Sequence, residues 1–238
     1  TNGQRSLIVN LSDADLKPEG WDSLAKPVLN APEDIAIYEL HIRDFSIIDN
    51  SVPEAERGTF MAFAHSDTNG MKHLKNLADA GLTHIHLLPA FDCASVNEIK
   101  AQQKVVVGDL ASLAADSESQ QAAISSIRGE EGFNWCYDPF HYTVPDGNYA
   151  TDPEGVARIK EFRSMVAGLS KAGLRVVMDV VYNHTSGALQ SETAVLDKVV
   201  PGYYHRLNAN GDIENSTCCA NTASENAMME KLMLDSMK

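Results

Sequence analysis

Three polar side chains interrupt an apolar run in the second half of the chain. Residues 175–184 read Arg-Val-Val-Met-Asp-Val-Val-Tyr-Asn-His, so Asp179, Asn183 and His184 come towards the C-terminal end of the run. Such a run predicts a strand buried inside a parallel sheet and covered on both faces. In a barrel of parallel strands the carboxyl ends carry the active site. These three side chains are therefore expected where chemistry takes place.

The three residues admit more than one kind of site. Asp179 and Asn183 share strand parity and are expected to face the barrel interior, with His184 at the rim. A buried polar ladder would fix the neighbouring loops. A Ca²⁺ site using the Asn183 amide oxygen would need several further oxygen ligands. Substrate contact is the third alternative, and the residues alone leave all three open.

A dense aromatic cluster lies at residues 133–140, with the sequence Phe-Asn-Trp-Cys-Tyr-Asp-Pro-Phe. Trp135 and Tyr137 offer flat apolar faces with polar tips, which suit sugar rings that stack through their C–H faces. Asp138 adds an acceptor for sugar hydroxyls. The alternative is that these rings only pack the loop against the rest of the protein.

His84 and His86 form a His-x-His pair on another apolar run, at residues 83–91. Metal-dependent barrel hydrolases use such pairs to hold zinc or similar ions. Here the pair comes at the start of the predicted strand, away from its carboxyl end. Packed or hydrogen-bonded core histidines are therefore the favoured interpretation, and no metal ligand is predicted.

Four cysteines are present, at Cys93, Cys136, Cys218 and Cys219. None of their spacings matches the Cys-x-x-Cys pattern of zinc or thioredoxin-like redox sites, so packing or disulfide formation is favoured. An even number of cysteines is compatible with an oxidising compartment.

Charge and hydropathy exclude two classes of partner. The chain has 238 residues and a formal net charge of −14, which disfavours nucleic acid because phosphates require clustered Lys and Arg. No apolar stretch approaches the roughly 18 residues of a membrane span. The first five residues lack the charged and apolar regions of a signal peptide. We therefore expect the N-terminus to be an internal cut or a mature end.

Strands and helices are predicted to alternate along the chain. Strands are expected at residues 35–45, 83–91 and 175–184, with helices starting near Met71 and Pro153 between them. Asn69 and Asp152 are suitable N-caps, and Gly81 and Gly173 are suitable stops. Right-handed crossovers make the three strands parallel, which gives an α/β fold. Further helices are expected within 109–127 and at 227–234, the latter behind a Thr222–Glu225 capping box.

The order of these elements gives three βα units, whereas a closed barrel needs eight. Residues 1–34 are expected to be a connector from a preceding module, and 35–238 the N-terminal portion of a barrel. Long insertions are predicted at 92–133 and, shorter, at 185–221. The third strand would lack a neighbour and leave an exposed apolar edge that promotes aggregation.

Three stretches together resemble the pullulanases of the alpha-amylase superfamily, in the same order. They are Tyr38–Asp44, Asn134–Pro139 and Asp179–His184. The middle stretch is similar to the pullulanase signature Tyr-Asn-Trp-Gly-Tyr-Asp-Pro, and the last to the first conserved region of the superfamily. Ile8–Asp13 and Thr217–Cys219 resemble the Gram-negative bacterial enzymes.

This resemblance implies a (β/α)8 TIM barrel that hydrolyses α-1,6-glucosidic branch linkages with retention of configuration. The substrate would be an α-glucan such as pullulan or a branched dextrin, with the remainder of the barrel needed as a partner for a complete fold. No cofactor is required, and Ca²⁺ binding stays open. A secreted, periplasmic or cell-surface location is implied by the Gram-negative relatives.

The resemblance also implies roles for individual residues. Tyr137 would stack against the sugar in the subsite before the cleaved bond, and His184 would hydrogen-bond its primary hydroxyl region. Asp138, Asp179 and Asn183 would support that subsite. The family's Asp nucleophile and Glu acid/base lie on later strands, beyond Lys238. The chain is therefore expected to carry no catalytic residue and to be inactive alone.

Two residues depart from the family signature, in which Phe133 is Tyr and Cys136 is Gly. Losing this glycine removes a permissive backbone angle unless the residue already has a negative φ. A bridge between Cys93 and Cys136 is a further expectation. Two other functions stay open: another alpha-amylase superfamily hydrolase such as an α-amylase or isoamylase, and a non-catalytic sugar-binding half-barrel that uses Trp135 and Tyr137.

Overall fold

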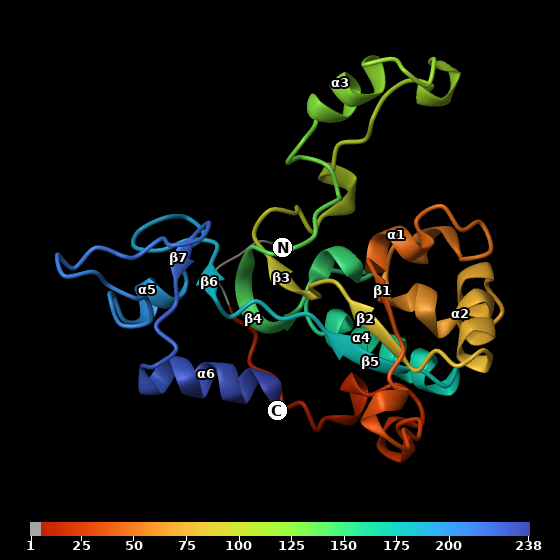
Figure 1. Cartoon of the computed structure of the whole chain (residues 1–238), viewed down its shortest axis with the longest axis horizontal. Coiled ribbons are helices and arrows are strands. Elements are labelled where there is room, and N and C mark those ends of the chain that lie inside the picture. The colour runs from red at the N-terminus through yellow and green to blue at the C-terminus, as the bar shows by residue number, and fades with distance from the viewer. Residues whose placement is uncertain (1–5) are drawn as a thin grey trace.

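A three-stranded parallel sheet lies at the centre of the protein, and a computed structural model describes residues 6–238 (Figure 1). The sheet contains β1 (Ile37–Leu40), β2 (His84–Leu87) and β5 (Arg175–Met178), in the order β1-β2-β5. Both pairings are parallel, with Ile37 opposite His84 and His84 opposite Arg175. The expected α/β fold with a parallel sheet is confirmed, and the sheet is open.

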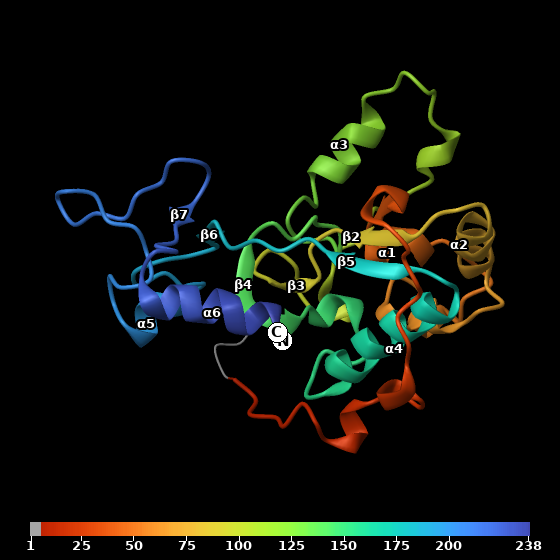
Figure 2. The ribbon, with the colours of Figure 1, turned by 60° about the horizontal axis from the view of Figure 1, so that its bottom comes forward.

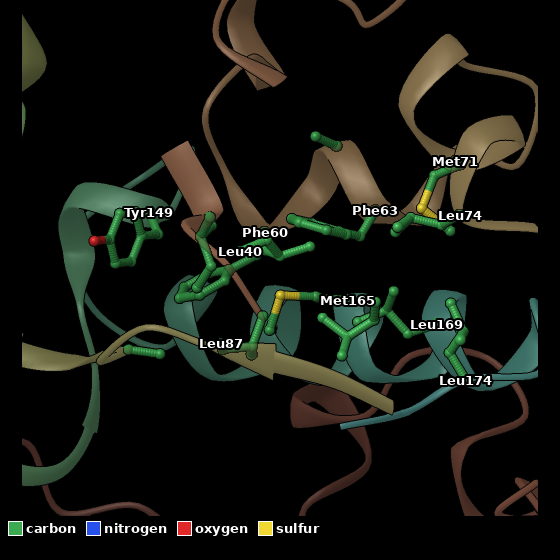
Figure 3. Packing of buried hydrophobic residues seen from close by; sticks show 14 of the residues in the cluster. Leu40, Phe60, Phe63, Met71, Leu74, Leu87, Tyr149, Met165, Leu169 and Leu174 are labelled. Atoms are coloured by element: carbon green, nitrogen blue, oxygen red, sulfur yellow. The ribbon is translucent and has the colours of Figure 1, made fainter. Parts of the chain in front are cut away.

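Two helices connect the strands of this sheet. Helix α2 (Asn69–Asp79) follows β1, and α4 (Ala157–Lys171) precedes β5. Their apolar side chains, together with those of the 3₁₀ turn Phe60–Ala64, form the main core (Figure 3). Fully buried members include Phe63, Leu74 and Leu169, and burial of each such side chain contributes about 1.5–3 kcal/mol. This core fixes the sheet whose carboxyl ends carry the site.

One glycine permits the closest contact in this core. A Cβ atom on Gly168 of α4 would lie 2.0 Å from the Phe63 carbonyl oxygen, which is far inside any allowed contact. The helix and the 3₁₀ turn can approach only because residue 168 has no side chain.

Several helix ends differ from the predictions. The N-cap of α2 is Thr68, whose hydroxyl accepts from the Met71 amide, so the prediction of Asn69 was one residue late. Helix α4 begins at Ala157 rather than at Pro153, because Asp152 accepts from the Glu154 amide and Gly155 has φ +67°. The segment 152–155 is therefore a turn that precedes the helix.

The C-terminal helix α6 (Ala227–Met237) begins behind Asn226, which makes no side-chain capping bond. The predicted Thr222–Glu225 capping box is wrong. The Glu225 carboxylate pairs with Arg206 at 2.6 Å instead, and Thr222 donates its hydroxyl hydrogen to the Tyr182 carbonyl. The side chains of Thr222 and Glu225, which a capping box would use, therefore bond to other parts of the chain.

All three predicted strands are shorter than expected. The first ends at Leu40 because His41 caps the short helix α1 (Ile42–Ser46). The second divides into β2 and β3 (Phe91–Cys93). The third ends at Met178, and the chain re-enters a strand only at β6 (His184–Thr185), which pairs with β7 (Ala220–Asn221). The parity argument for Asp179 and Asn183 therefore fails, since both lie outside regular strands.

The predicted insertion 92–133 contains little regular structure. Strand β3 pairs with β4 (Pro139–Pro145) in an antiparallel ladder. The predicted helix over 109–127 is reduced to a 3₁₀ turn at Leu110–Ser112 and the helix α3 (Ser119–Ser125). In Figures 1 and 2 the part of this insertion around α3 projects away from the rest of the chain. It therefore contributes no cover to the central sheet.

A second lobe carries α5 (Leu196–Val199), β6, β7 and α6 at the opposite end from α2 (Figures 1 and 2). A buried network fixes β6, in which the Thr185 hydroxyl lies 2.8 Å from His205 Nε2, and His205 Nδ1 lies 3.2 Å from Asp197. Burial alone would raise the pKa of Asp197, but amide donors from Leu189 and Gly202 hold it below its ordinary value. This network secures the strand that begins with His184.

The N-terminal segment packs on the domain through several contacts. Arg163 of α4 donates to the carbonyls of Leu11 and Leu16, both at 3.0 Å, and its guanidinium lies 5.4 Å from the Trp21 ring centroid. Arg175 donates to the Pro27 carbonyl at 2.8 Å. The boundary of the predicted connector 1–34 stays a prediction, and its first five residues lie outside the described part.

Short 3₁₀ turns make up most of the remaining local structure. They span Ala14–Leu16, Trp21–Ser23, Pro32–Asp34, Glu54–Glu56, Lys100–Gln102 and Gly147–Tyr149. Among residues 6–238, no helix combines the length and apolar character needed to cross a membrane.

The open sheet predicts self-association. Within residues 6–238, β5 pairs with β2 and with no other strand, and Val180, two residues after its end, is 37% exposed. We expect the 238-residue chain to associate through this edge, since unpaired backbone groups and apolar side chains recruit another strand. Size-exclusion chromatography with light scattering would detect the associated species.

Val180→Lys is expected to shift the chain towards monomer by placing a charge at the edge. Leu189→Lys is the matched control, because Leu189 is 62% exposed and lies outside the sheet. A monodisperse wild-type monomer that unfolds cooperatively would contradict this expectation.

Candidate sugar-binding site

Two buried histidines hold the aromatic loop, residues 133–138, at the carboxyl edge of the sheet. His41 directly follows β1, and its Nε2 lies 2.9 Å from the Asn134 carbonyl oxygen. His184 opens β6, and its Nε2 lies 2.8 Å from the Tyr137 carbonyl oxygen. The Nδ1 atom of His41 accepts from the Asp44 amide. The Nδ1 atom of His184 is the partner of the Asn183 side-chain amide, so both Nε2 atoms carry the proton and donate.

His41 has a structural role that the sequence reasoning missed. It lies within the Tyr38–Asp44 stretch, but no function was derived for it from the residues. Its position immediately after a strand was the available signal, since side chains there reach the same edge as those after other parallel strands. Burial lowers the pKa of His41 despite the opposing effect of the Asn134 carbonyl, so the ring favours the neutral state.

The Tyr137 hydroxyl donates to the Asp179 carboxylate, with an oxygen–oxygen distance of 2.5 Å. Burial, followed by the hydrogen bond to Asp179, raises the pKa of Tyr137 to about 12, so the phenol stays protonated. The Tyr137 side chain nevertheless remains 40% exposed. A ring whose hydroxyl is fixed and whose body stays accessible can stack on a ligand with little further loss of side-chain entropy.

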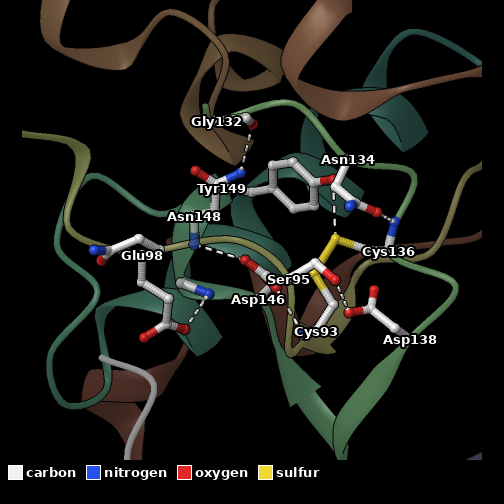
Figure 4. The surroundings of a disulfide bond; sticks show 12 residues. Cys93, Ser95, Glu98, Gly132, Asn134, Cys136, Asp138, Asp146, Asn148 and Tyr149 are labelled. Carbon is white, nitrogen blue, oxygen red and sulfur yellow. Dashed lines mark hydrogen bonds between the residues drawn. A yellow bond between two sulfur atoms is a disulfide. The ribbon is translucent and has the colours of Figure 1, made fainter. Parts of the chain in front are cut away.

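Four of the predicted residues are linked by direct contacts. Tyr137 contacts Asp179 through its hydroxyl and His184 through its carbonyl, and Asn183 lies 3.1 Å from His184. Asp138 instead accepts from the Ser95 hydroxyl, and its carbonyl accepts from the Ala94 amide (Figure 4). It therefore ties the loop to the chain after β3. Trp135 is 59% exposed and is the most open aromatic residue of the loop.

Cys93 and Cys136 form a disulfide bond, with their Cα atoms 5.3 Å apart (Figure 4). The expected bridge is confirmed, and it joins the aromatic loop to β3. Cys136 has φ +58°, which is the left-handed conformation that glycine adopts without cost. The residue is not at negative φ, so replacing the signature's glycine with cysteine here does lose a permissive backbone angle.

Two buried carboxylates, Asp146 and Glu98, lie beside the β3 end of the disulfide that holds the aromatic loop. Asp146 accepts from the amides of Cys93 and Asn148 at 2.9 and 2.7 Å. Burial, followed by the charge of Asp92, raises its pKa to about 8. Glu98 pairs with Arg158 at 2.7 Å, also in the interior. Because such groups need complete partners when buried, this platform fixes the base of the loop.

The His-x-His pair occupies the positions expected of structural histidines. His84 is buried and its Nδ1 lies 2.8 Å from the Thr83 hydroxyl. His86 pairs with Glu39 of the neighbouring strand at 3.5 Å. Among the described residues, three or more potential metal ligands come together at two places. One is His184, Cys218 and Cys219, and the other is Cys93, Cys136 and Asp146, where the bridge has consumed both thiols.

Cys218 and Cys219 are free thiols beside His184. The Cys218 sulfur lies 3.9 Å from His184 Nδ1 and 3.8 Å from Nε2. Burial, followed by the hydrogen bond to Cys218, raises the pKa of the Cys219 thiol to about 11. Sequence spacing did not associate these cysteines with His184, because the β6–β7 pairing that brings them together is a tertiary feature.

Comparison with known proteins identifies the family. No family model matches the chain. The chloroplastic pullulanase 1 of Arabidopsis thaliana is 51% identical over 241 residues, which cover 99% of this chain and 25% of that protein. A Klebsiella aerogenes pullulanase is 42% identical over 277 residues, covering 100% and 25%. This chain is a pullulanase homologue. It spans about a quarter of the length of these pullulanases.

Solved pullulanase structures agree with this result. The crystal structure of PulA from Klebsiella oxytoca superposes with a TM-score of 0.93 at 40% identity, covering 100% of this chain and 26% of that one. A maltotriose complex of PulA from Klebsiella pneumoniae gives 0.91 at 40% identity, covering 100% and 30%. The pullulanase resemblance, including its Gram-negative members, is confirmed. The plant pullulanase has the higher identity, whereas a rice isoamylase is only 28% identical.

The disulfide and the positive φ at Cys136 can be separated by two substitutions. Cys136→Gly and Cys136→Ala both remove the bridge, but only glycine tolerates φ +58°. We expect the alanine variant to be less stable than the glycine variant by about 1 kcal/mol. Chemical denaturation of both variants in the same background measures this difference. Equal stabilities would show that the loop leaves the left-handed conformation once the bridge is lost.

Proposed function

We propose that the protein carrying this chain hydrolyses α-1,6-glucosidic linkages in pullulan and branched dextrins, with retention of configuration. The observation that carries this proposal is the Tyr137 ring, accessible at the carboxyl edge of a parallel sheet while Asp179 fixes its hydroxyl. Such a ring is a stacking surface for a glucose unit. Similarity to pullulanases, one of them solved with maltotriose, supports an α-glucan as the ligand.

Each residue of the site has a proposed role. Tyr137 stacks on the sugar in the subsite before the cleaved bond, and Trp135 extends this apolar surface. Asp179 and Asn183 offer polar groups to sugar hydroxyls. His184 hydrogen-bonds the primary hydroxyl region, for which its Nδ1 atom exchanges the Asn183 amide for the sugar, while its Nε2 atom holds the loop. Asp138 holds the loop in place by accepting a hydrogen bond from the Ser95 hydroxyl.

The complete fold is proposed to be an eight-stranded barrel. The open sheet β1-β2-β5 supports this, because parallel sheets are covered on both faces and a barrel closes the two edges of such a sheet on each other. In this arrangement the described chain supplies the first three βα units. The remaining units would pair with the free edges of β1 and β5.

The bond-breaking carboxylates are proposed to lie outside this chain. A retaining glycosidase uses two carboxyl groups about 5 Å apart, one as nucleophile and one as acid/base. In the pullulanase family these belong to the fourth and fifth strands. The proposed function of this chain is therefore to bind and position the sugar. No cofactor is proposed, and Ca²⁺ binding stays an open alternative.

The compartment is proposed from the same relatives. The Klebsiella resemblance and the Cys93–Cys136 bridge support export to an oxidising secreted, periplasmic or cell-surface location. The plant pullulanase is chloroplastic by name. Cell fractionation with an antibody against this sequence distinguishes the two locations.

Stacking by Tyr137 is tested in the protein at its natural length. Tyr137→Ala is expected to lower kcat/KM on pullulan by about 10- to 100-fold, because the apolar contact with the sugar is removed. Tyr137→Phe keeps the ring and loses only the hydrogen bond to Asp179, so a decrease of about 3- to 10-fold is expected. An alanine variant as active as wild type would reject the proposed subsite, and a preference of the wild type for amylose over pullulan would favour an α-amylase.

The isolated 238-residue chain is expected to release no maltotriose from pullulan, because it lacks the proposed carboxylate pair. Product chromatography after long incubation measures this. A matched sample of the natural-length protein serves as the positive control. Maltotriose release by the isolated chain would contradict the assignment of catalysis to other strands, whereas maltotriose binding without hydrolysis would agree with a sugar-binding portion.

A further inference from the structure

Three soft metal-binding side chains converge beside the aromatic loop. One ligand atom from each of His184, Cys218 and Cys219 lies within 4.8 Å of the other two. The two cysteines are not in a disulfide bond, and the Cys218 sulfur lies 3.8–3.9 Å from the imidazole nitrogens. Zinc–sulfur and zinc–nitrogen bond lengths place ligand atoms about 3.5–3.8 Å apart in a tetrahedron. The three groups therefore need only small side-chain adjustments to share one ion.

One ring nitrogen of His184 already makes the hydrogen bond that is common in metal-bound histidines. His184 Nε2 donates to the Tyr137 carbonyl at 2.8 Å, and metal-bound histidines commonly donate their second ring N–H to a carbonyl in this way. The lone pair is consequently on Nδ1, which accepts from the Asn183 amide at 3.1 Å. That amide also lies 3.2 Å from the Thr217 hydroxyl. The Asn183 amide therefore keeps the Thr217 hydroxyl as a partner when Nδ1 of His184 binds an ion.

We propose that His184, Cys218 and Cys219 form a binding site for a soft divalent cation of the zinc class. Two thiolates and one imidazole select such ions over Ca²⁺ or Mg²⁺, which prefer oxygen ligands. Three protein ligands leave a fourth coordination position. Cys218 is exposed and Cys219 is half-buried, so an ion from solution can reach the thiol side of the site.

The ion regulates sugar binding, and this part of the inference rests on the proposed function. It ties Cys218 and Cys219 to the imidazole that holds Tyr137, and it occupies Nδ1, the atom proposed to exchange its Asn183 partner for the sugar. Bound cation and bound sugar therefore exclude each other. Zinc inhibits hydrolysis, and a chelator restores it.

Cobalt(II) is the probe for the site, because thiolate ligation gives a charge-transfer band in the near ultraviolet and tetrahedral geometry gives strong visible bands. The natural-length protein is titrated under a mild phosphine treatment that leaves the buried Cys93–Cys136 bridge intact, as thiol counting verifies, with wild type compared to Cys218→Ser and Cys219→Ser. We expect each single variant to lose affinity by at least about tenfold, and the double variant to lose both bands. Ser216→Ala is the matched control, since this residue lies in the same segment and bonds Asn221 instead.

Three results would overturn the site: bands that persist in the double variant, absence of bands in a protein whose Cys218 and Cys219 titrate as free thiols, or a bond between these two cysteines that survives the reductant. Inhibition is measured separately, as zinc-dependent loss of pullulan hydrolysis in wild type but not in the double variant. Equal inhibition of both would overturn the regulatory part alone. Cobalt bands in a protein without pullulan hydrolysis would support the site and reject the proposed function.

Discussion

The site depends on hydrogen bonds from two buried histidines to the backbone of the aromatic loop. His41 and His184 follow different strands, yet their Nε2 atoms bond the carbonyls of Asn134 and Tyr137. A loop carbonyl without a partner would be costly in this partly buried setting, and neutral imidazoles supply donors without introducing a charge. The exposed rings are thus held by main-chain contacts that leave their faces accessible.

The Cys93–Cys136 bridge acts on the same loop from the opposite side. It joins the loop to β3 at a residue whose left-handed backbone is unfavourable for any side chain. The signature of the family meets this geometry with glycine, which needs no support. Here a covalent link holds an unfavourable conformation in place, and the buried Asp146 fixes the β3 side by accepting from the Cys93 amide.

The parallel sheet positions two of the side chains that contact the aromatic loop. Three parallel strands bring the ends after β1 and β5 to one edge, where His41 and Asp179 reach the loop. Within residues 6–238, neither outer edge of this sheet is paired with a further strand.

The sequence alone determined the α/β class, the three parallel strands, the aromatic loop and the cysteine pair, because periodicity, turn residues and motif composition are local properties. Tertiary structure decided the rest. The third strand ends at Met178 and the chain pairs again only where β6 meets β7, so the parity expected for Asn183 is lost. The same pairing brought Cys218 to His184 across 34 residues. Contacts between distant segments depend on packing free energy, which no local pattern encodes.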